Sequence, residues 1–180
     1  MVSAWTINTV GRIDLQELSR YPGPSGSDCE IFEPIRTESK MGIVECSPAI
    51  LEAAGKTLDA EGPVYMVNMV RYRDQADYRG KWEFQPCSGR EAYFQRYAPA
   101  FNNVAQGEDY GLFWVGNVRG VLVGAEGENW DDIVIVRYAS FATLRRILES
   151  SAYEAEAAPH RRAALADWRF IVTTQPHPPK

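Results

Sequence analysis

The chain has 180 residues, of which 45% are hydrophobic and 24% are charged, and its formal net charge at pH 7 is −5. These values predict one soluble globular domain, large enough to bury a core without disulfides or a structural metal. The net negative charge argues against nucleic acid as the main partner, and no apolar run approaches the roughly 20 residues of a membrane span.

The cysteines and the first residues indicate the compartment. Cys29, Cys46 and Cys87 are odd in number and share no C-x-x-C spacing, which predicts free thiols in a reducing environment. The N-terminus has neither a basic start nor a long apolar core, so no signal peptide is expected. We therefore expect a cytoplasmic protein with no membrane partner.

Residues 1–61 are expected to form an N-terminal extension of uncertain structure. Asp14 is a candidate cap of a short helix, residues 30–36 and 41–46 are candidate strands, and Pro48 begins a helix. Three roles stay open for this extension. It covers a cavity mouth, extends a sheet, or makes dimer contacts.

The main domain is expected at residues 62–175 and begins with a strand. Residues 62–72 are β-branched and aromatic with little polar character, which predicts an interior strand covered on both faces. Ser88 and Glu91 have the spacing of a capping box at the start of a helix, and Pro99 is expected to kink or shorten that helix. The apolar stripe of this helix consists of Tyr93, Tyr97, Phe101 and Val104.

Two more strands are expected in the middle of this domain. Residues 111–124 predict a long strand, in which Gly116 and Gly120 suggest a bulge or a bend. After a turn, residues 131–138 predict the next strand. The two strands are therefore expected to pair as neighbours.

The second helical region and the last strand close the domain. Ser140 and Ser150 are candidate caps of successive helices, and Pro159 is expected to interrupt the second or to begin another. Residues 168–174 predict the closing strand, and residues 176–180 are expected to be a disordered tail.

In chain order these elements read strand, helix, strand, strand, helix, strand, which is the ferredoxin-like arrangement. It predicts an α+β fold with a four-stranded antiparallel sheet and both helices on one face. The other face would present apolar side chains to water, and such a patch is usually covered by a partner. We expect a homodimer, formed face to face, with a space between the two sheets.

Four segments carry a resemblance to a known family: YMVNMVRY, SGREAYFQRY, WDDIVIVRYASF and SSAYEAEAAPHRRAALADWRFI. Together they resemble the longer members of the domain of unknown function 1330 family, in the dimeric α/β-barrel superfamily. The pattern HR-x-A-A-L-x-D-x-R, from His160 to Arg169, is the most specific part. The turn Tyr138-Ala139-Ser140 departs from the usual Tyr-Pro-Ser, and residues 1–61 have no counterpart.

The resemblance implies a dimeric α/β barrel but no particular activity. The superfamily includes cofactor-free monooxygenases, polyketide cyclases, muconolactone-type isomerases, haem enzymes and non-catalytic stress proteins. Function must therefore be argued from a site.

Three residues are candidates for catalysis. His160 has a near-neutral ordinary pKa and suits acid/base work, although packing on a helix face with a backbone hydrogen bond is the alternative. Arg137 lies on one strand face with Ile133 and Ile135 and could hold a carboxylate or enolate, or form an ion pair at the rim. Asn68 either bonds a substrate oxygen or a side chain of a neighbouring strand.

Four further residues are candidates for substrate binding. Arg71 and Tyr72 close the first strand on opposite faces, so one of them is expected at the cavity rim. Trp114 could line an apolar pocket. Tyr97 lies on the helical stripe and is either a core or a lining residue.

Three functional hypotheses follow. The first is a cofactor-independent cyclase, isomerase or monooxygenase that acts on a small apolar oxygenated substrate in the inter-sheet cavity. The second is a non-catalytic dimeric binding or scaffold protein, and the third is a haem protein with His160 as ligand. No metal site is expected, because His160 and His177 are the only histidines.

Overall fold

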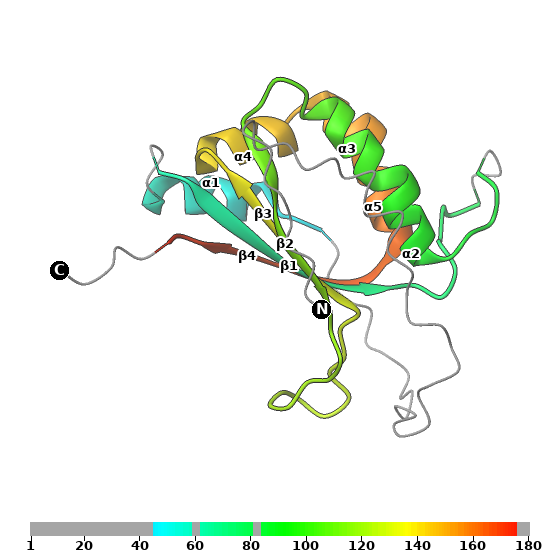
Figure 1. Cartoon of the computed structure of the whole chain (residues 1–180). Coiled ribbons are helices and arrows are strands. Elements are labelled where there is room, and N and C mark those ends of the chain that lie inside the picture. The colour runs from blue at the N-terminus through cyan, green and yellow to red at the C-terminus, as the bar shows by residue number, and fades with distance from the viewer. Residues whose placement is uncertain (1–44, 59–61, 81–83, 176–180) are drawn as a thin grey trace, which may run out of the picture.

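The computed structural model describes residues 45–58, 62–80 and 84–175. Within these ranges the chain forms a four-stranded antiparallel sheet in the order β2-β3-β1-β4, with the helices packed on one face (Figure 1). The predicted ferredoxin-like α+β fold is confirmed. The expectations for Cys29, Asp14, residues 30–36 and the tail 176–180 fall outside the described residues.

The strands lie close to their predicted positions. β1 (Val64–Tyr72) occupies an interior position between β3 (Asp132–Tyr138) and β4 (Leu165–Thr173), and β2 (Tyr110–Asn117) is an edge strand. Every second residue of β1 is buried beneath the helices, and these residues are Val64, Met66, Asn68 and Val70. The strand thus divides the molecule into a helix side and an opposite side.

The opposite side, which we call the open face of the sheet, carries mostly apolar residues. Its members on the two central strands are Tyr65, Val67, Met69, Ile133, Ile135 and Arg137. Phe113, Trp114 and Ile171 continue this face and are 60%, 50% and 46% exposed. The predicted apolar sheet face is therefore present, and the described helices do not cover it.

Two helical segments cover the other face, and each contains a π-helical turn. The first comprises α2 (Gly89–Ala92), η2 (Tyr93–Tyr97) and α3 (Ala98–Val104). The second ends with η3 (Tyr153–Ala157) and α5 (Ala158–Ala164). Caps predicted from the sequence are present, since the Ser88, Ser140 and Ser150 hydroxyls accept backbone N–H groups of Glu91, Thr143 and Tyr153 at 3.1 Å.

The prolines are accommodated only partly as predicted: Pro159 lies in the first turn of α5, which is the alternative that it begins a helix. Pro99 and Pro159 neither shorten nor break the helical segments, because each follows a π turn. In these turns the Ala98 and Ala158 N–H groups donate five residues back, to the Tyr93 and Tyr153 carbonyls. The wider turn relieves the clash that a proline ring has in a regular α-helix.

The end of β2, the position of its irregularity and the start of β4 also differ from the prediction. β2 ends at Asn117 and not at residue 124, and its register shifts between Leu112 and Trp114. Gly116 remains regular, and its missing side chain leaves room for the Trp114 indole. β4 begins at Leu165, three residues earlier than predicted, because the chain extends directly from α5 into the pairing with Tyr72.

The last residues of the predicted strand 111–124 lie in a loop between β2 and β3 that projects beyond the sheet (Figure 1). Leu122 and Val123 at its tip are 97% and 96% exposed. They form no ladder with β3, so the predicted strand is wrong for this part of the chain.

Helices α1 (Pro48–Thr57) and α4 (Phe141–Leu148) complete the described elements. The predicted start of α1 at Pro48 is confirmed, whereas Glu45 and Cys46, the described end of the candidate strand 41–46, lie in neither helix nor strand. Leu51 of α1 joins the main core with Phe141 and Leu144. At least the end of the N-terminal extension therefore packs on the domain.

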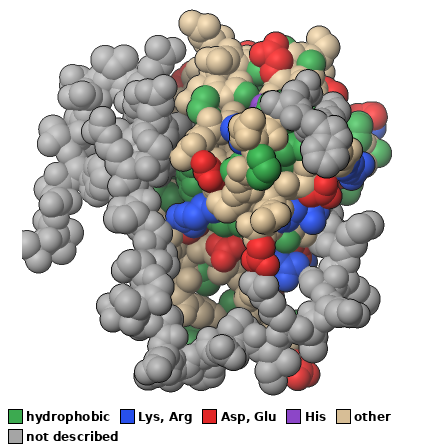
Figure 2. Space-filling model, turned by 90° about the vertical axis from the view of Figure 1, so that its right-hand side faces the viewer, with side chains coloured by type: hydrophobic (Ala, Val, Ile, Leu, Met, Phe, Trp, Pro, Cys, Tyr) green, Lys and Arg blue, Asp and Glu red, His purple; other side chains and the backbone are tan. Residues whose placement is uncertain are grey.

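The surface is mixed in charge. Figure 2 shows acidic and basic side chains interspersed on one side of the molecule, and ion pairs such as Arg162–Glu154, at 2.7 Å, join them. No helix in the described part of the chain has the length and apolar character to cross a membrane.

Candidate functional site

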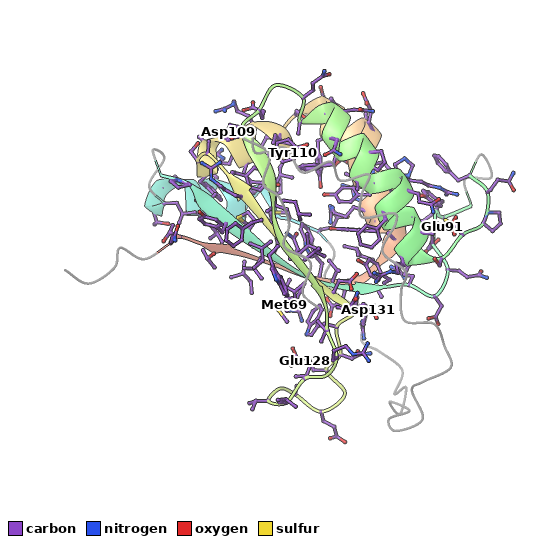
Figure 3. The ribbon with its side chains drawn as sticks, viewed as in Figure 1. Met69, Glu91, Asp109, Tyr110, Glu128 and Asp131 are labelled. Carbon is purple, nitrogen blue, oxygen red and sulfur yellow. The ribbon has the colours of Figure 1, made fainter. Side chains whose placement is uncertain are left out.

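The candidate site is a partly open cavity of about 60 Å³ between the sheet and the helices. Its walls come from all four strands and from the helical segments, and the side chains are predominantly aromatic. The aromatic lining includes Tyr93, Tyr97, Phe101, Tyr110, Tyr138, Tyr153 and Trp168. Figure 3 shows Tyr110 on the helix side of the sheet, whereas Met69 lies on the other side. We call this space the sheet–helix cavity.

Three of the lining phenols have hydroxyls with no hydrogen bond among the described residues: Tyr93, Tyr97 and Tyr138. Buried hydroxyls are normally hydrogen-bonded, so these groups are available to a bound molecule or to water. Burial raises the pKa of each of the three phenols, and the neighbouring Tyr153 raises it further. They therefore stay protonated at neutral pH and act as hydrogen-bond donors.

Tyr153 differs from the other phenols because it is joined to a buried cation. Arg161 Nε donates to the Tyr153 hydroxyl oxygen at 3.0 Å. The Arg161 side chain is 3% exposed, and its guanidinium lies 4.5 Å from the centre of the Trp168 ring. The tyrosine and the tryptophan both line the cavity, so a positive charge lies directly behind its wall.

Asn68 lies on the cavity wall but is largely occupied by the protein. Its Nδ2 donates to the Met66 and Val134 carbonyls at 3.1 Å, and its Oδ1 accepts from Trp168 Nε1 at 3.0 Å. Of the two roles that the sequence left open, this geometry favours a bond to a neighbouring strand. Both amide hydrogens are used, so Asn68 cannot donate to a ligand oxygen in this arrangement.

Tyr72 points to a buried carboxylate next to the cavity. Asp132 is 0% exposed, and its oxygens accept from the Tyr72 hydroxyl at 2.9 Å, from Arg90 Nη1 at 2.6 Å and from Asn117 Nδ2 at 2.6 Å. Four residues from four elements, β1, β2, β3 and α2, thus satisfy one another. This network explains the placement of Tyr72 without a ligand.

Three other candidates do not line the cavity. Arg137 lies on the open face and pairs with Asp109 at 3.3 Å, which is the alternative foreseen for it. Trp114 lies on the same face, and Arg71 Nη1 donates to Asn129 Oδ1 at 3.3 Å near the loop between β2 and β3. Among the residues proposed for substrate binding, Tyr97 is the one that the structure brings to the cavity.

His160 also lies away from the cavity. Its Nδ1 is 2.9 Å from the Tyr78 hydroxyl, and its ring packs edge-on against Tyr78 and Phe84. Burial lowers the pKa of His160, and the nearby positive charge of Arg96 lowers it further. The ring is thus held neutral in a small aromatic cluster, and its partner is a hydroxyl, not the backbone carbonyl expected as its alternative.

Of the His160–Arg161–Arg162 run, the sequence pattern singled out His160, whereas Arg161 is the residue that contacts two lining side chains, Tyr153 and Trp168. Tyr138, Tyr153 and Arg161 were not among the candidates, although Tyr153 and Arg161 lie eight residues apart. Residues at that spacing share one face of a helix, which is the signal that could have found the pair.

Comparisons with known proteins support the fold and name no activity. Two solved structures resemble this chain: one titled as the methylated RPA0582 protein, with 29% identity and a TM-score of 0.67, covers 78% of this chain and 100% of its own. A second, the RPA0582 protein of unknown function from Rhodopseudomonas palustris, has 29% identity and a TM-score of 0.65 and covers 76% and 99%. No family model and no curated protein match the chain, so the resemblance to the domain of unknown function 1330 family stays a prediction.

Proposed function

We propose that this chain is a cofactor-independent enzyme that binds a small, largely apolar, oxygen-bearing molecule in the sheet–helix cavity. The observation that carries the proposal is the set of three neutral phenols, Tyr93, Tyr97 and Tyr138, that line the cavity and whose hydroxyls have no hydrogen-bond partner among the described residues. Apolar pockets with a few converging polar groups are the usual form of small-molecule sites.

The volume of the cavity limits the ligand. An apolar cavity of roughly 150 Å³ is known to hold benzene, whereas this one measures about 60 Å³. We therefore expect the oxygen-bearing end of the ligand to enter the cavity and the rest to lie at its opening. Phe94, Leu112 and Leu148 are lining residues that remain partly exposed and suit contact with that outer part.

The lining also limits the chemistry. Within the described residues the cavity wall contains phenols, one amide and one indole, and no carboxylate or imidazole. Donors of this kind stabilise negative charge that develops on an oxygen. We expect enolisation of a ligand whose C–H proton is acidic enough to be transferred to a water molecule, so that the phenols only stabilise the enolate oxygen that forms.

A second candidate function is non-catalytic binding of the same class of molecule. The lack of a carboxylate or imidazole in the described lining favours it. The two functions differ in one outcome, because a binding protein would hold the ligand without converting it.

We also propose that two copies pair through the open face. Phe113 and Trp114 are large, apolar and at least half exposed there, and Phe113 packs edge-on against Tyr65 to extend the apolar area. Sedimentation velocity is the direct measurement. A dimer that Trp114→Lys converts to a monomer supports the pairing, and a monomeric wild type contradicts it.

The binding proposal is tested by ligand-observed NMR with a set of small phenols and carbonyl compounds. Tyr97→Phe and Tyr138→Phe should each weaken a bound compound several-fold, because each removes one donor. Tyr65→Phe is the matched control, since its hydroxyl lies on the open face and bonds Gln175 Oε1 at 3.3 Å. No bound compound, or equal weakening by all three changes, would contradict the proposal.

A further inference from the structure

The proposed function leaves the charge of the ligand oxygen open, and the pair Tyr153–Arg161 addresses it. We infer that the cavity selects a ligand whose oxygen is an oxyanion, an enolate or a phenolate, and that the Tyr153 hydroxyl, polarised by Arg161, donates to it. This inference rests on the proposed cavity site and adds the chemical class of its ligand.

The direction of the Tyr153 proton follows from its hydrogen bond. The phenol oxygen accepts from Arg161 Nε at 3.0 Å, so its own O–H cannot point along that line. Tyr153 is 5% exposed and lines the cavity, and no acceptor for its proton occurs among the described residues. The cavity is therefore where the proton is available to a ligand.

The charge of Arg161 makes this hydroxyl a stronger donor than the others. A hydrogen bond from a cation withdraws electron density from the phenol oxygen, and such bonds act cooperatively. One of its charged partners is Glu45, whose Oε2 lies 3.5 Å from Arg161 Nη2 on a side chain that is 54% exposed. Solvent screens an exposed carboxylate, whereas the charge of the buried guanidinium is screened less and acts on the cavity more strongly.

The rest of the lining agrees with a negative oxygen. Tyr93, Tyr97 and Tyr138 are protonated donors that share Tyr153 as an electrostatic neighbour. The described lining contains no carboxylate that would repel an anion. It also contains no cation in addition to Arg161 behind the wall, so a single negative charge is enough to balance the site. One delocalised negative charge on a planar molecule matches this arrangement.

The probe for this inference is 4-nitrophenol, because its absorbance reports directly whether the bound molecule is ionised. 4-Nitrotoluene has the same ring and lacks the oxygen, so it is the matched neutral compound. Titration of the full-length protein should show that the bound nitrophenol ionises at lower pH than free nitrophenol. A shift of one pH unit corresponds to a tenfold preference for phenolate, or about 1.4 kcal/mol.

Two variants should shift the pH at which bound nitrophenol ionises, and they should shift it in opposite directions. Tyr153→Phe should abolish most of the preference for phenolate, while Glu45→Gln should increase it, because it removes the partial counter-charge of Arg161. A merely structural role of Tyr153 would not predict the opposite effect of Glu45→Gln. Tyr65→Phe on the open face should leave the titration unchanged.

The outcomes separate this inference from the proposed function. Equal binding of nitrotoluene and nitrophenol, with no shift in ionisation, overturns the inference and leaves the cavity as an apolar site. Failure of nitrophenol to bind, when the NMR set has given a cavity ligand, overturns it as well. Failure of every compound to bind contradicts both proposals.

Discussion

The Trp168 indole nitrogen donates to the Asn68 amide oxygen at 3.0 Å, beneath the helices. Asn68 continues the connection through its Nδ2 to the Val134 carbonyl at 3.1 Å. Side chains thus add hydrogen bonds between β4, β1 and β3 in an otherwise apolar layer. Since both residues line the sheet–helix cavity, the same bonds fix the position of two of its wall residues.

We expect Asn68→Ala to lower the free energy of unfolding by about 2 kcal/mol, because it leaves the buried Trp168 N–H without an acceptor. Trp168→Phe removes that donor and should cost less in the Asn68→Ala background than in the wild type. Urea denaturation of the two single variants and the double variant gives the coupling, expected near 1 kcal/mol. If the losses of the two single variants add up to the loss of the double variant, the hydrogen bond between Trp168 and Asn68 does not contribute to stability.

The lining phenols should differ in their effect on stability. Tyr138→Phe removes a hydroxyl that has no hydrogen-bond partner in the described part of the chain, and it should leave the free energy of unfolding unchanged or raise it by up to about 1 kcal/mol. Tyr153→Phe removes the acceptor of Arg161 Nε and should lower the free energy of unfolding by about 1–2 kcal/mol. Thermal and urea denaturation check both values, and the reverse order would show that Tyr138 has a structural partner.

The buried Asp132 should be among the most sensitive positions. Asp132→Ala leaves three donors without their shared acceptor, and we expect a loss of about 2–4 kcal/mol in the free energy of unfolding. Asp109→Ala is the control, since its pair with Arg137 is exposed and should contribute less than about 1 kcal/mol. Similar losses for the two changes would mean that burial does not decide the effect.

Stability should depend on pH through His160. Burial and the charge of Arg96 lower the pKa of this residue in the folded protein, whereas an unfolded chain has the ordinary value of about 6.5. The unfolded chain then binds more protons just below about pH 6.5, so the free energy of unfolding falls as the pH falls through this window. His160→Gln should flatten the dependence between about pH 7 and pH 5.5. If the free energy of unfolding of this variant depends on pH as it does in the wild type, groups other than His160 cause the dependence.

Gly89 should not tolerate a side chain. A Cβ atom there would overlap the Ala164 carbonyl and the Arg73 backbone, where the Gly89 N–H donates to the Arg73 carbonyl at 3.0 Å. We expect Gly89→Ala to cost about 2–4 kcal/mol, because backbone atoms on both sides must move. Gly120→Ala meets open space and is the control. Equal melting temperatures of the two variants would contradict the close approach.

The sequence was sufficient for the fold because local rules acted consistently along the chain. The mostly apolar β1 run predicted its interior position, and the Ser88 and Ser140 caps placed the helix starts within a residue. Each of these signals depends on neighbouring residues only. The order of the elements then left few arrangements of the sheet.

The site was decided by the tertiary structure. Which of His160, Arg161 and Arg162 faces the sheet depends on the rotation of one helix, since successive residues on a helix point about 100° apart. The π turn that precedes α5 contains an extra residue in the hydrogen-bonded ring and changes that rotation. Packing of the helix on the sheet therefore placed Arg161 behind Tyr153 and directed His160 to Tyr78, a choice that no local pattern contains.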